Sequence, residues 1–119
     1  MAAIFKWGDR ELTVLRSEYL YGSYKQLALL AFDEDDPECC IESGMPYGVI
    51  TVNLDDPMCE PEGDSKYGVQ YLDVNNWPGL SWILSHSDID WAEQTESKMQ
   101  SGFVTYPLWI FDLEKIQHV

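Results

Sequence analysis

The sequence predicts an α+β domain with a largely antiparallel sheet of about five to six strands and one or two short helices. Two observations favour this fold. Short apolar segments with strand periodicity recur between turn-forming residues, and a helix-start signal precedes the segment Leu80 to His86. The chain has 119 residues, 45% of them hydrophobic and 24% charged, which is typical of one globular domain over residues 1–119.

The chain begins with a predicted β-hairpin. Ile4 to Trp7 and Glu11 to Leu15 are its expected strands, and Gly8-Asp9 is its turn. The apolar segment Tyr24 to Phe32 contains no breaker and fits either a buried strand or a short helix. We favour a strand, because the neighbouring segments are strands.

Further strands and one helix are expected after a loop over 33–47. The strands are Tyr47 to Leu54, Tyr67 to Val74 and Phe103 to Phe111, and the helix is Leu80 to His86. The polar segment Ser87 to Ser101 fits a short helix or a loop. Because proline lacks a backbone donor, we expect the last strand to be kinked or edge-placed at Pro107.

The same periodicity predicts the hydrophobic core. Residues two positions apart on a strand share one face, so the inward face can be chosen from its apolar members. A single domain needs one contiguous core to collect these side chains. The expected core residues are Phe5, Trp7, Leu12, Val14, Leu27, Leu29, Val49, Ile50, Val52, Tyr71, Leu84, Phe103 and Phe111.

Charge is the unusual property of this chain. Twenty-one Asp and Glu face seven Lys and Arg, for a net charge of −14. This excludes a protein that binds nucleic acid through a broadly basic surface, and it disfavours binding to an anionic membrane. Expected partners are basic proteins or cations.

Targeting and redox signals favour the cytoplasm. The N-terminal residues lack the pattern of a signal peptide, and the longest apolar run, Leu27 to Phe32, is too short to span a bilayer. The three cysteines, Cys39, Cys40 and Cys59, form no C-x-x-C motif and fit a reducing compartment. Their acidic surroundings should raise the thiol pKa values, so we expect unreactive thiols.

Two stretches carry a resemblance to a known family. The first is Phe5-Lys6-Trp7-Gly8-Asp9-Arg10, and the second is Ser101-Gly102-Phe103-Val104-Thr105-Tyr106-Pro107-Leu108. With Thr51 to Leu54 and Asp73 to Asn76 between them, they resemble a family of small bacterial proteins of unknown function, carried by conjugative elements and phages of gut bacteria. The resemblance implies an α+β fold and a mobile-element origin, and it transfers no catalytic residue.

Motifs that mark reaction chemistry are missing. The sequence contains no G-x-S-x-G, no Walker A and no G-x-G-x-x-G. Asp73 and Asp112 stand beside apolar residues at strand ends, where an acid is more often a turn residue than a catalyst. We therefore predict that the protein is not an enzyme and has no cofactor.

No metal site is predicted either. His86, Asp88 and Asp90 lack a defined ligand spacing, and His86 is expected to be a solvated helix-end residue. His118 is expected in a frayed terminus. Counted from Asp33, the acidic run fails the EF-hand template, although weak divalent binding to a dense acidic loop stays open.

The sequence feature that indicates a function is an acidic segment from Gln26 to Ser65, which contains no Lys or Arg. Over roughly 26 Å of strand, its carboxylates would match the order of charge density of duplex DNA. We predict a non-catalytic inhibitor that mimics nucleic acid, of anti-CRISPR or anti-restriction type, and that binds a basic nucleic-acid-handling protein such as a host defence nuclease. The predicted partner-binding residues are Asp33, Glu34, Asp35, Asp36, Glu38, Glu42, Asp55, Asp56, Glu60, Glu62 and Asp64.

Three alternatives stand beside this hypothesis. The acids could serve solubility alone, because net charge keeps small proteins monomeric. The protein could instead be a structural or regulatory interaction module with an exposed aromatic surface, for which Trp77 and Trp91 are the first candidates. A hydrolase or metal-dependent enzyme would need a concave pocket with a buried carboxylate.

Overall fold

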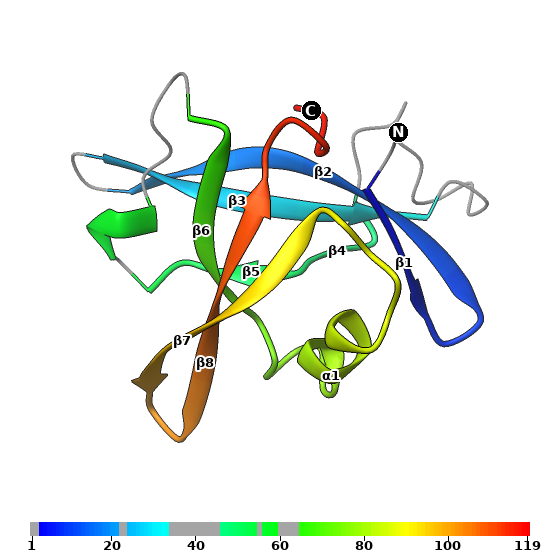
Figure 1. The fold of residues 1–119 in the computed structure, drawn as a ribbon. Coiled ribbons are helices and arrows are strands. Elements are labelled where there is room, and N and C mark those ends of the chain that lie inside the picture. Colours follow the sequence, from blue (N-terminus) through cyan, green and yellow to red (C-terminus); the bar gives the residue numbers. More distant parts are fainter. Residues whose placement is uncertain (1–2, 22–23, 34–45, 55, 60–64) are drawn as a thin grey trace.

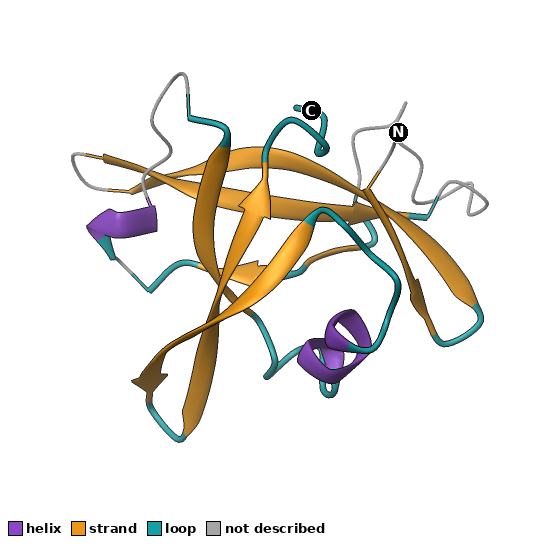
Figure 2. Cartoon of the chain, in the orientation of Figure 1, coloured by secondary structure: helices purple, strands orange, loops and turns teal. Residues whose placement is uncertain are grey.

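The computed structural model describes residues 3–21, 24–33, 46–54, 56–59 and 65–119. These residues form eight strands in two four-stranded sheets, with one short α-helix and a 3-10 turn (Figures 1 and 2). All the strand ladders are antiparallel, as predicted, but the strands are more numerous and divide between two sheets. The Cα radius of gyration is 13.6 Å, close to the ~13.5 Å of a compact single domain of this length.

The first sheet is a meander of four strands in sequence order. Its members are β1 (Ala3–Trp7), β2 (Arg10–Tyr21), β3 (Tyr24–Phe32) and β4 (Gly48–Val49). The predicted hairpin is confirmed: Trp7 pairs with Arg10 across a two-residue turn, in which Gly8 has a φ of 65° that favours glycine. β2 is longer than predicted because it pairs with β3 over the whole of β3's length.

The second sheet has the order β5-β6-β8-β7. Its strands are β5 (Thr51–Val52), β6 (Tyr67–Leu72), β7 (Ala92–Ser101) and β8 (Val104–Asp112). The 3-10 turn η2 (Pro57–Cys59) precedes β6, and α1 (Leu80–Ser85) precedes β7, so the predicted helix is confirmed.

One extended segment belongs to both sheets. The predicted strand Tyr47 to Leu54 is divided into β4 and β5 at Ile50, which is completely buried. The Ile50 N–H donates to the Leu29 carbonyl at 3.0 Å, and its own carbonyl accepts from the Asp73 N–H at 2.8 Å. The chain therefore turns a corner from one sheet to the other at Ile50, as strands do where two sheets cross.

The prediction of a helix or loop over Ser87 to Ser101 is wrong from Ala92 onward, where the chain forms β7. This strand lies at the sheet edge and pairs only with β8. Few of its side chains face inward, so its sequence is polar and lacks the apolar alternation of a half-buried strand. β7 also has a register shift between Gln94 and Lys98.

Pro107 lies in an inner strand rather than at an edge. It is accommodated because the β6–β8 ladder ends one residue away, at the pair Tyr71–Leu108. On its other side, Pro107 stands opposite Lys98, at the limit of the β7 irregularity. Prolines within sheets are confined to places of this kind.

Most of the core prediction is confirmed. Phe5, Leu12, Val14, Leu27, Leu29, Ile50, Tyr71, Leu84 and Phe111 are buried, whereas Trp7, Val49 and Val52 are half-buried. Phe103 was placed wrongly: it is fully exposed, because it occupies the second position of the two-residue turn between β7 and β8. A turn tip has no opposite sheet to pack against.

A buried polar pair joins the two sheets. Gln26 of β3 and Gln70 of β6 are both completely buried. The Gln70 side-chain Nε2 donates to the Leu27 carbonyl at 2.8 Å, and its Oε1 accepts from the Tyr71 N–H at 2.9 Å. The Gln26 Nε2 donates to the Asp56 carbonyl at 2.8 Å. These bonds satisfy polar groups that would otherwise be costly to bury.

Candidate functional site

Asp33, the first acid of the predicted binding segment, has a structural role. Its side chain is 7% exposed and forms an ion pair with Arg10 at the start of β2. The Arg10 guanidinium also lies over the Tyr47 ring, 5.1 Å from its centroid. Asp33 therefore fixes the end of β3 and does not project from the surface.

Asp56 also bonds inward. Its Oδ2 accepts a hydrogen bond from the Tyr71 hydroxyl at 2.7 Å, and its Oδ1 accepts from the Met58 N–H at 3.0 Å. Burial of the Tyr71 hydroxyl, together with this bond, raises the Tyr71 pKa above its usual range. Asp56 therefore holds η2 against β6.

The other nine predicted binding residues, Glu34, Asp35, Asp36, Glu38, Glu42, Asp55, Glu60, Glu62 and Asp64, lie outside the described residues. The structure places a described residue next to each of the two acidic segments. Asp33 lies just after β3, and Asp56, next to η2, accepts a hydrogen bond from Gln26 near the start of β3. Seven residues of strand separate Gln26 from Asp33, which is roughly 23 Å. The two acidic segments are thus anchored at opposite ends of β3.

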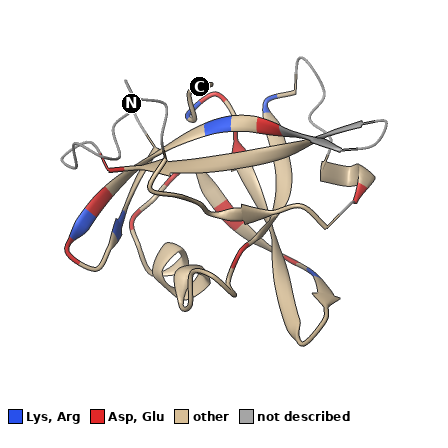
Figure 3. Cartoon of the chain, turned by 180° about the vertical axis from the view of Figure 1, so that it is seen from behind, with Lys and Arg blue, Asp and Glu red and all other residues tan. Residues whose placement is uncertain are grey.

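The described acids and bases form no single patch. Figure 3 shows Asp, Glu, Lys and Arg spread over several elements of both sheets. Ion pairs join Lys66 to Glu114 at 3.8 Å and Lys115 to Asp90 at 3.0 Å. By contrast, residues 34–64 contain acids and no Lys or Arg.

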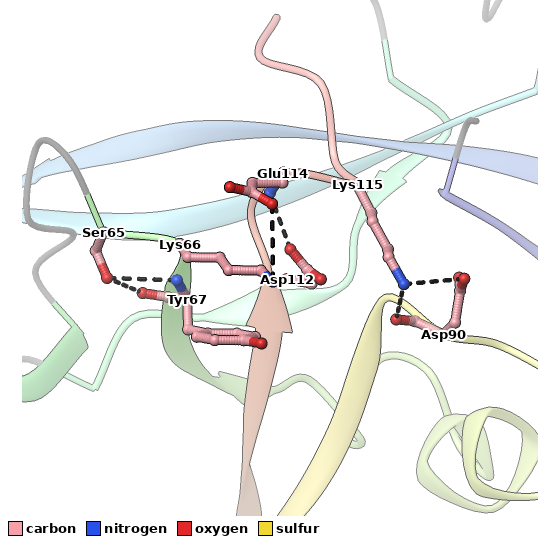
Figure 4. A network of polar contacts seen from close by, with 7 residues as sticks. All are labelled: Ser65, Lys66, Tyr67, Asp90, Asp112, Glu114 and Lys115. Atoms are coloured by element: carbon pink, nitrogen blue, oxygen red, sulfur yellow. Dashed lines mark hydrogen bonds and ion pairs between the residues drawn. The ribbon is translucent and has the colours of Figure 1, made fainter.

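A groove of about 650 Å³ lies beside the starts of β6 and β7 and the end of β8. Figure 4 shows its polar contacts, in which Lys66 and Lys115 each face an acid. Asp112 accepts a hydrogen bond from the Glu114 N–H at 3.1 Å, which makes it a turn residue, as predicted. The described lining of this groove contains no histidine or cysteine.

A second hollow, of about 490 Å³, was missed by the sequence analysis. The Trp7, Tyr47 and Trp77 rings line it together with Asp73 and Asn76. The Asp73 side chain accepts from the Asn76 N–H at 3.2 Å and from the Asn76 Nδ2 at 2.8 Å, in the turn that precedes α1. These residues come from separate segments, so no local sequence pattern could have indicated the hollow.

Cys59 is the one cysteine among the described residues, and it is buried. Burial, with a smaller contribution from the Asp56 charge, raises its pKa to about 12. The thiol is therefore protonated at neutral pH, and the predicted rise in its pKa is confirmed, with burial as a larger cause than the acidic surroundings. That Cys59 is unreactive stays a prediction.

We expect Cys59 to resist alkylation until the protein unfolds. In a variant with Cys39→Ser and Cys40→Ser, native protein should react with iodoacetamide at neutral pH far more slowly than protein in denaturant. Mass spectrometry of timed samples measures both rates. Equal rates would contradict the burial of the thiol.

The two histidines differ in their surroundings. His86 is exposed at the C-terminal end of α1, as predicted, where its ring stacks on Trp82 with centroids 4.3 Å apart. His118 is not frayed: its backbone bridges β2 at Arg16, and the Val119 N–H donates to the Arg16 carbonyl at 2.9 Å. Within the described part of the chain, no three His, Cys, Asp or Glu residues are grouped to hold a metal ion.

The two tryptophans expected first on an interaction surface are not exposed. Trp77 and Trp91 are buried, so their assignment as the first candidates for an interaction surface is wrong. Among the described residues, the large exposed aromatics are Tyr47, Tyr67, Trp82 and Phe103. Tyr47 also lines the second hollow described above, which connects the exposed surface to the buried Trp77.

No protein-family model, curated protein or solved structure matches this chain. None of the helices in the described residues is long and apolar enough to cross a membrane.

Proposed function

We propose that this protein is a non-catalytic inhibitor that occupies the nucleic-acid-binding surface of a basic protein, such as a host defence nuclease. One observation carries the proposal: residues 26–65 contain eleven acids and no basic residue. Asp33 and Asp56 stabilise the fold, which leaves nine carboxylates to contact the partner. The proposed site of action is the cytoplasm.

The anchoring of the two acidic segments supports an elongated contact. Their attachment points lie roughly 23 Å apart along β3. Duplex DNA carries about one charge per 1.7 Å of axis, so nine carboxylates over such a span have a comparable order of charge density. A groove that binds a nucleic-acid backbone would attract them and position them.

The resemblance to small proteins of conjugative elements and phages supports the same proposal. Such elements must survive host nucleases, and acidic proteins that block nucleic-acid-binding surfaces answer that need. An anti-CRISPR or anti-restriction role would therefore explain why an element carries so acidic a protein.

Reversing the charge of Glu34, Asp35 and Asp36 to Lys should abolish inhibition. The matched control reverses Asp88, Glu93 and Glu96, which are exposed on other elements. Either triple variant changes the net charge from −14 to −8 (−14 + 6). The measurement is cleavage of duplex DNA by a panel of purified RNA-guided and restriction nucleases, at low and high salt, with each protein added.

We expect only the first variant to lose inhibition. We also expect the wild-type protein to inhibit less strongly at high salt than at low salt. If both variants inhibit equally well, the acids of residues 34–36 serve solubility and not partner binding. Equal loss in both variants would show a dependence on net charge and not on this segment. Asp33 stays unchanged in both, because its loss would leave Arg10 without this partner.

Phe103 favours a second candidate, an interaction module with an aromatic anchor. Its side chain is fully exposed at the β7–β8 turn, and residues 99–111 contain no charged residue. Interface centres are depleted in charge and enriched in aromatics. Loss of activity in Phe103→Ser, with the charge variants active, would favour this function over the first.

A further inference from the structure

We propose that the hollow between Trp7, Tyr47 and Trp77 binds a quaternary ammonium group. The proposal is independent of the acidic segments, because it uses only residues on β1, next to β4 and in the turn before α1. Its volume of about 490 Å³ is within the range of small-ligand sites. We call it the aromatic pocket.

The three rings are inclined to one another and do not form a parallel stack. The Trp7 and Trp77 ring centroids are 5.0 Å apart with an interplanar angle of 67°, and those of Tyr47 and Trp77 are 6.0 Å apart at 59°. Inclined rings around one hollow resemble the walls of an aromatic cage. Such cages attract cations through the negative faces of the rings.

Trp77 is held rigidly in place. Its indole Nε1 donates to the Val49 carbonyl at 2.8 Å, and the residue as a whole is 6% exposed. The ring lies against the β4 backbone at Gly48, where an added Cβ would be 2.6 Å from the Trp77 Cζ2. Glycine at this position therefore permits the close approach, and the wall of the pocket exists before any ligand arrives.

The Asp73 carboxylate supplies negative charge to the same pocket. Its residue is 7% exposed, and its hydrogen bonds come from the neutral Asn76. No Lys or Arg of the described chain pairs with it. Because the residue is largely buried, Coulomb attraction between its carboxylate and a bound cation would be screened less than in bulk water.

The aromatic walls favour a cation whose charge is spread over methyl groups. The Trp77 N–H donates to the Val49 carbonyl, and the Asn76 N–H and Nδ2 both donate to the Asp73 carboxylate. A quaternary ammonium needs no hydrogen-bond acceptor, so it can contact the ring faces while the Asp73 carboxylate keeps its bonds to Asn76. The Arg10 guanidinium lies over the Tyr47 ring, 5.1 Å from its centroid, so one of the three rings already contacts a cation of the chain itself.

Titration with choline tests the proposal, with 3,3-dimethylbutan-1-ol as the neutral molecule of the same shape. We expect saturable shifts of the Trp7 and Trp77 indole N–H resonances with choline, at a dissociation constant on the order of 1 mM, and at least about tenfold weaker binding of the alcohol. A trimethyl-lysine peptide, compared with the same peptide carrying unmodified lysine, distinguishes a protein side chain from a free ligand as the natural source.

Tyr47→Leu should weaken choline binding about fivefold or more while leaving the fold intact, because Tyr47 is 40% exposed. Trp82→Leu is the matched control, since Trp82 is an exposed aromatic outside the pocket. Asp73→Asn, checked for folding by circular dichroism, should also weaken binding. The proposal is overturned by equal binding of choline and the alcohol, by the lack of indole shifts with choline, or by an equal loss in the Trp82 variant.

Discussion

Replacing Phe111 with alanine should lower the free energy of unfolding by about 3–5 kcal/mol. Phe111 is completely buried in the main core, and its ring stacks on Trp91 with centroids 6.5 Å apart. Alanine would leave a cavity between β8 and its neighbours that the surrounding side chains fill only in part. Such a loss is a large fraction of the stability of a small domain.

Phe103→Ala provides the matched control, since it is the same substitution at a fully exposed position. Its expected effect is within about 0.5 kcal/mol. Urea denaturation followed by tryptophan fluorescence gives both values. Equal shifts of the two midpoints would contradict the difference in burial between the β7–β8 turn and the C-terminal end of β8.

Replacing Gln70 with leucine should cost about 2–6 kcal/mol, although leucine is more hydrophobic. The change removes the partner of the Leu27 carbonyl and of the Tyr71 N–H, both in the buried region between the sheets. Each unsatisfied buried group costs about 1–3 kcal/mol. The free energy of unfolding from urea titration measures the loss.

Gln117→Leu is the control for this second stability experiment, because Gln117 is exposed. It should change stability by less than about 0.5 kcal/mol. A Gln70 variant as stable as the Gln117 variant would mean that the buried pair contributes no net stability and that hydrophobic contacts alone hold β3 against β6.

Local patterns predicted the elements that have one buried face. Phe5, Leu12 and Val14 fit a period of two along their strands, so periodicity predicted both their strands and their burial correctly. β7 gives no such signal because an edge strand buries few side chains. Phe103 was wrongly predicted to be buried for a related reason. An apolar residue beside a strand is expected to face the core unless the position of the turn shows that it lies in the turn.

The candidate sites were harder to predict, because they depend on contacts between distant segments. Asp33 appeared to be one of a run of loop acids, yet its pairing with Arg10 depends on the β2–β3 register. The aromatic pocket brings together residues 7, 47, 73 and 77, which no spacing rule connects. By contrast, the acidic composition of residues 26–65 is evident from the sequence alone.

The corner at Ile50 has a consequence for the order of folding. The β1–β2 and β7–β8 hairpins join near neighbours in the chain and can form early. Ile50 reaches its final position only when Leu29 and Asp73 are both in place. Its N–H donates to the Leu29 carbonyl in β3, and its carbonyl accepts from the Asp73 N–H, just after β6. We therefore expect the hairpins to form first and the corner segment to close last, in the slow step that joins both sheets into one cooperative unit.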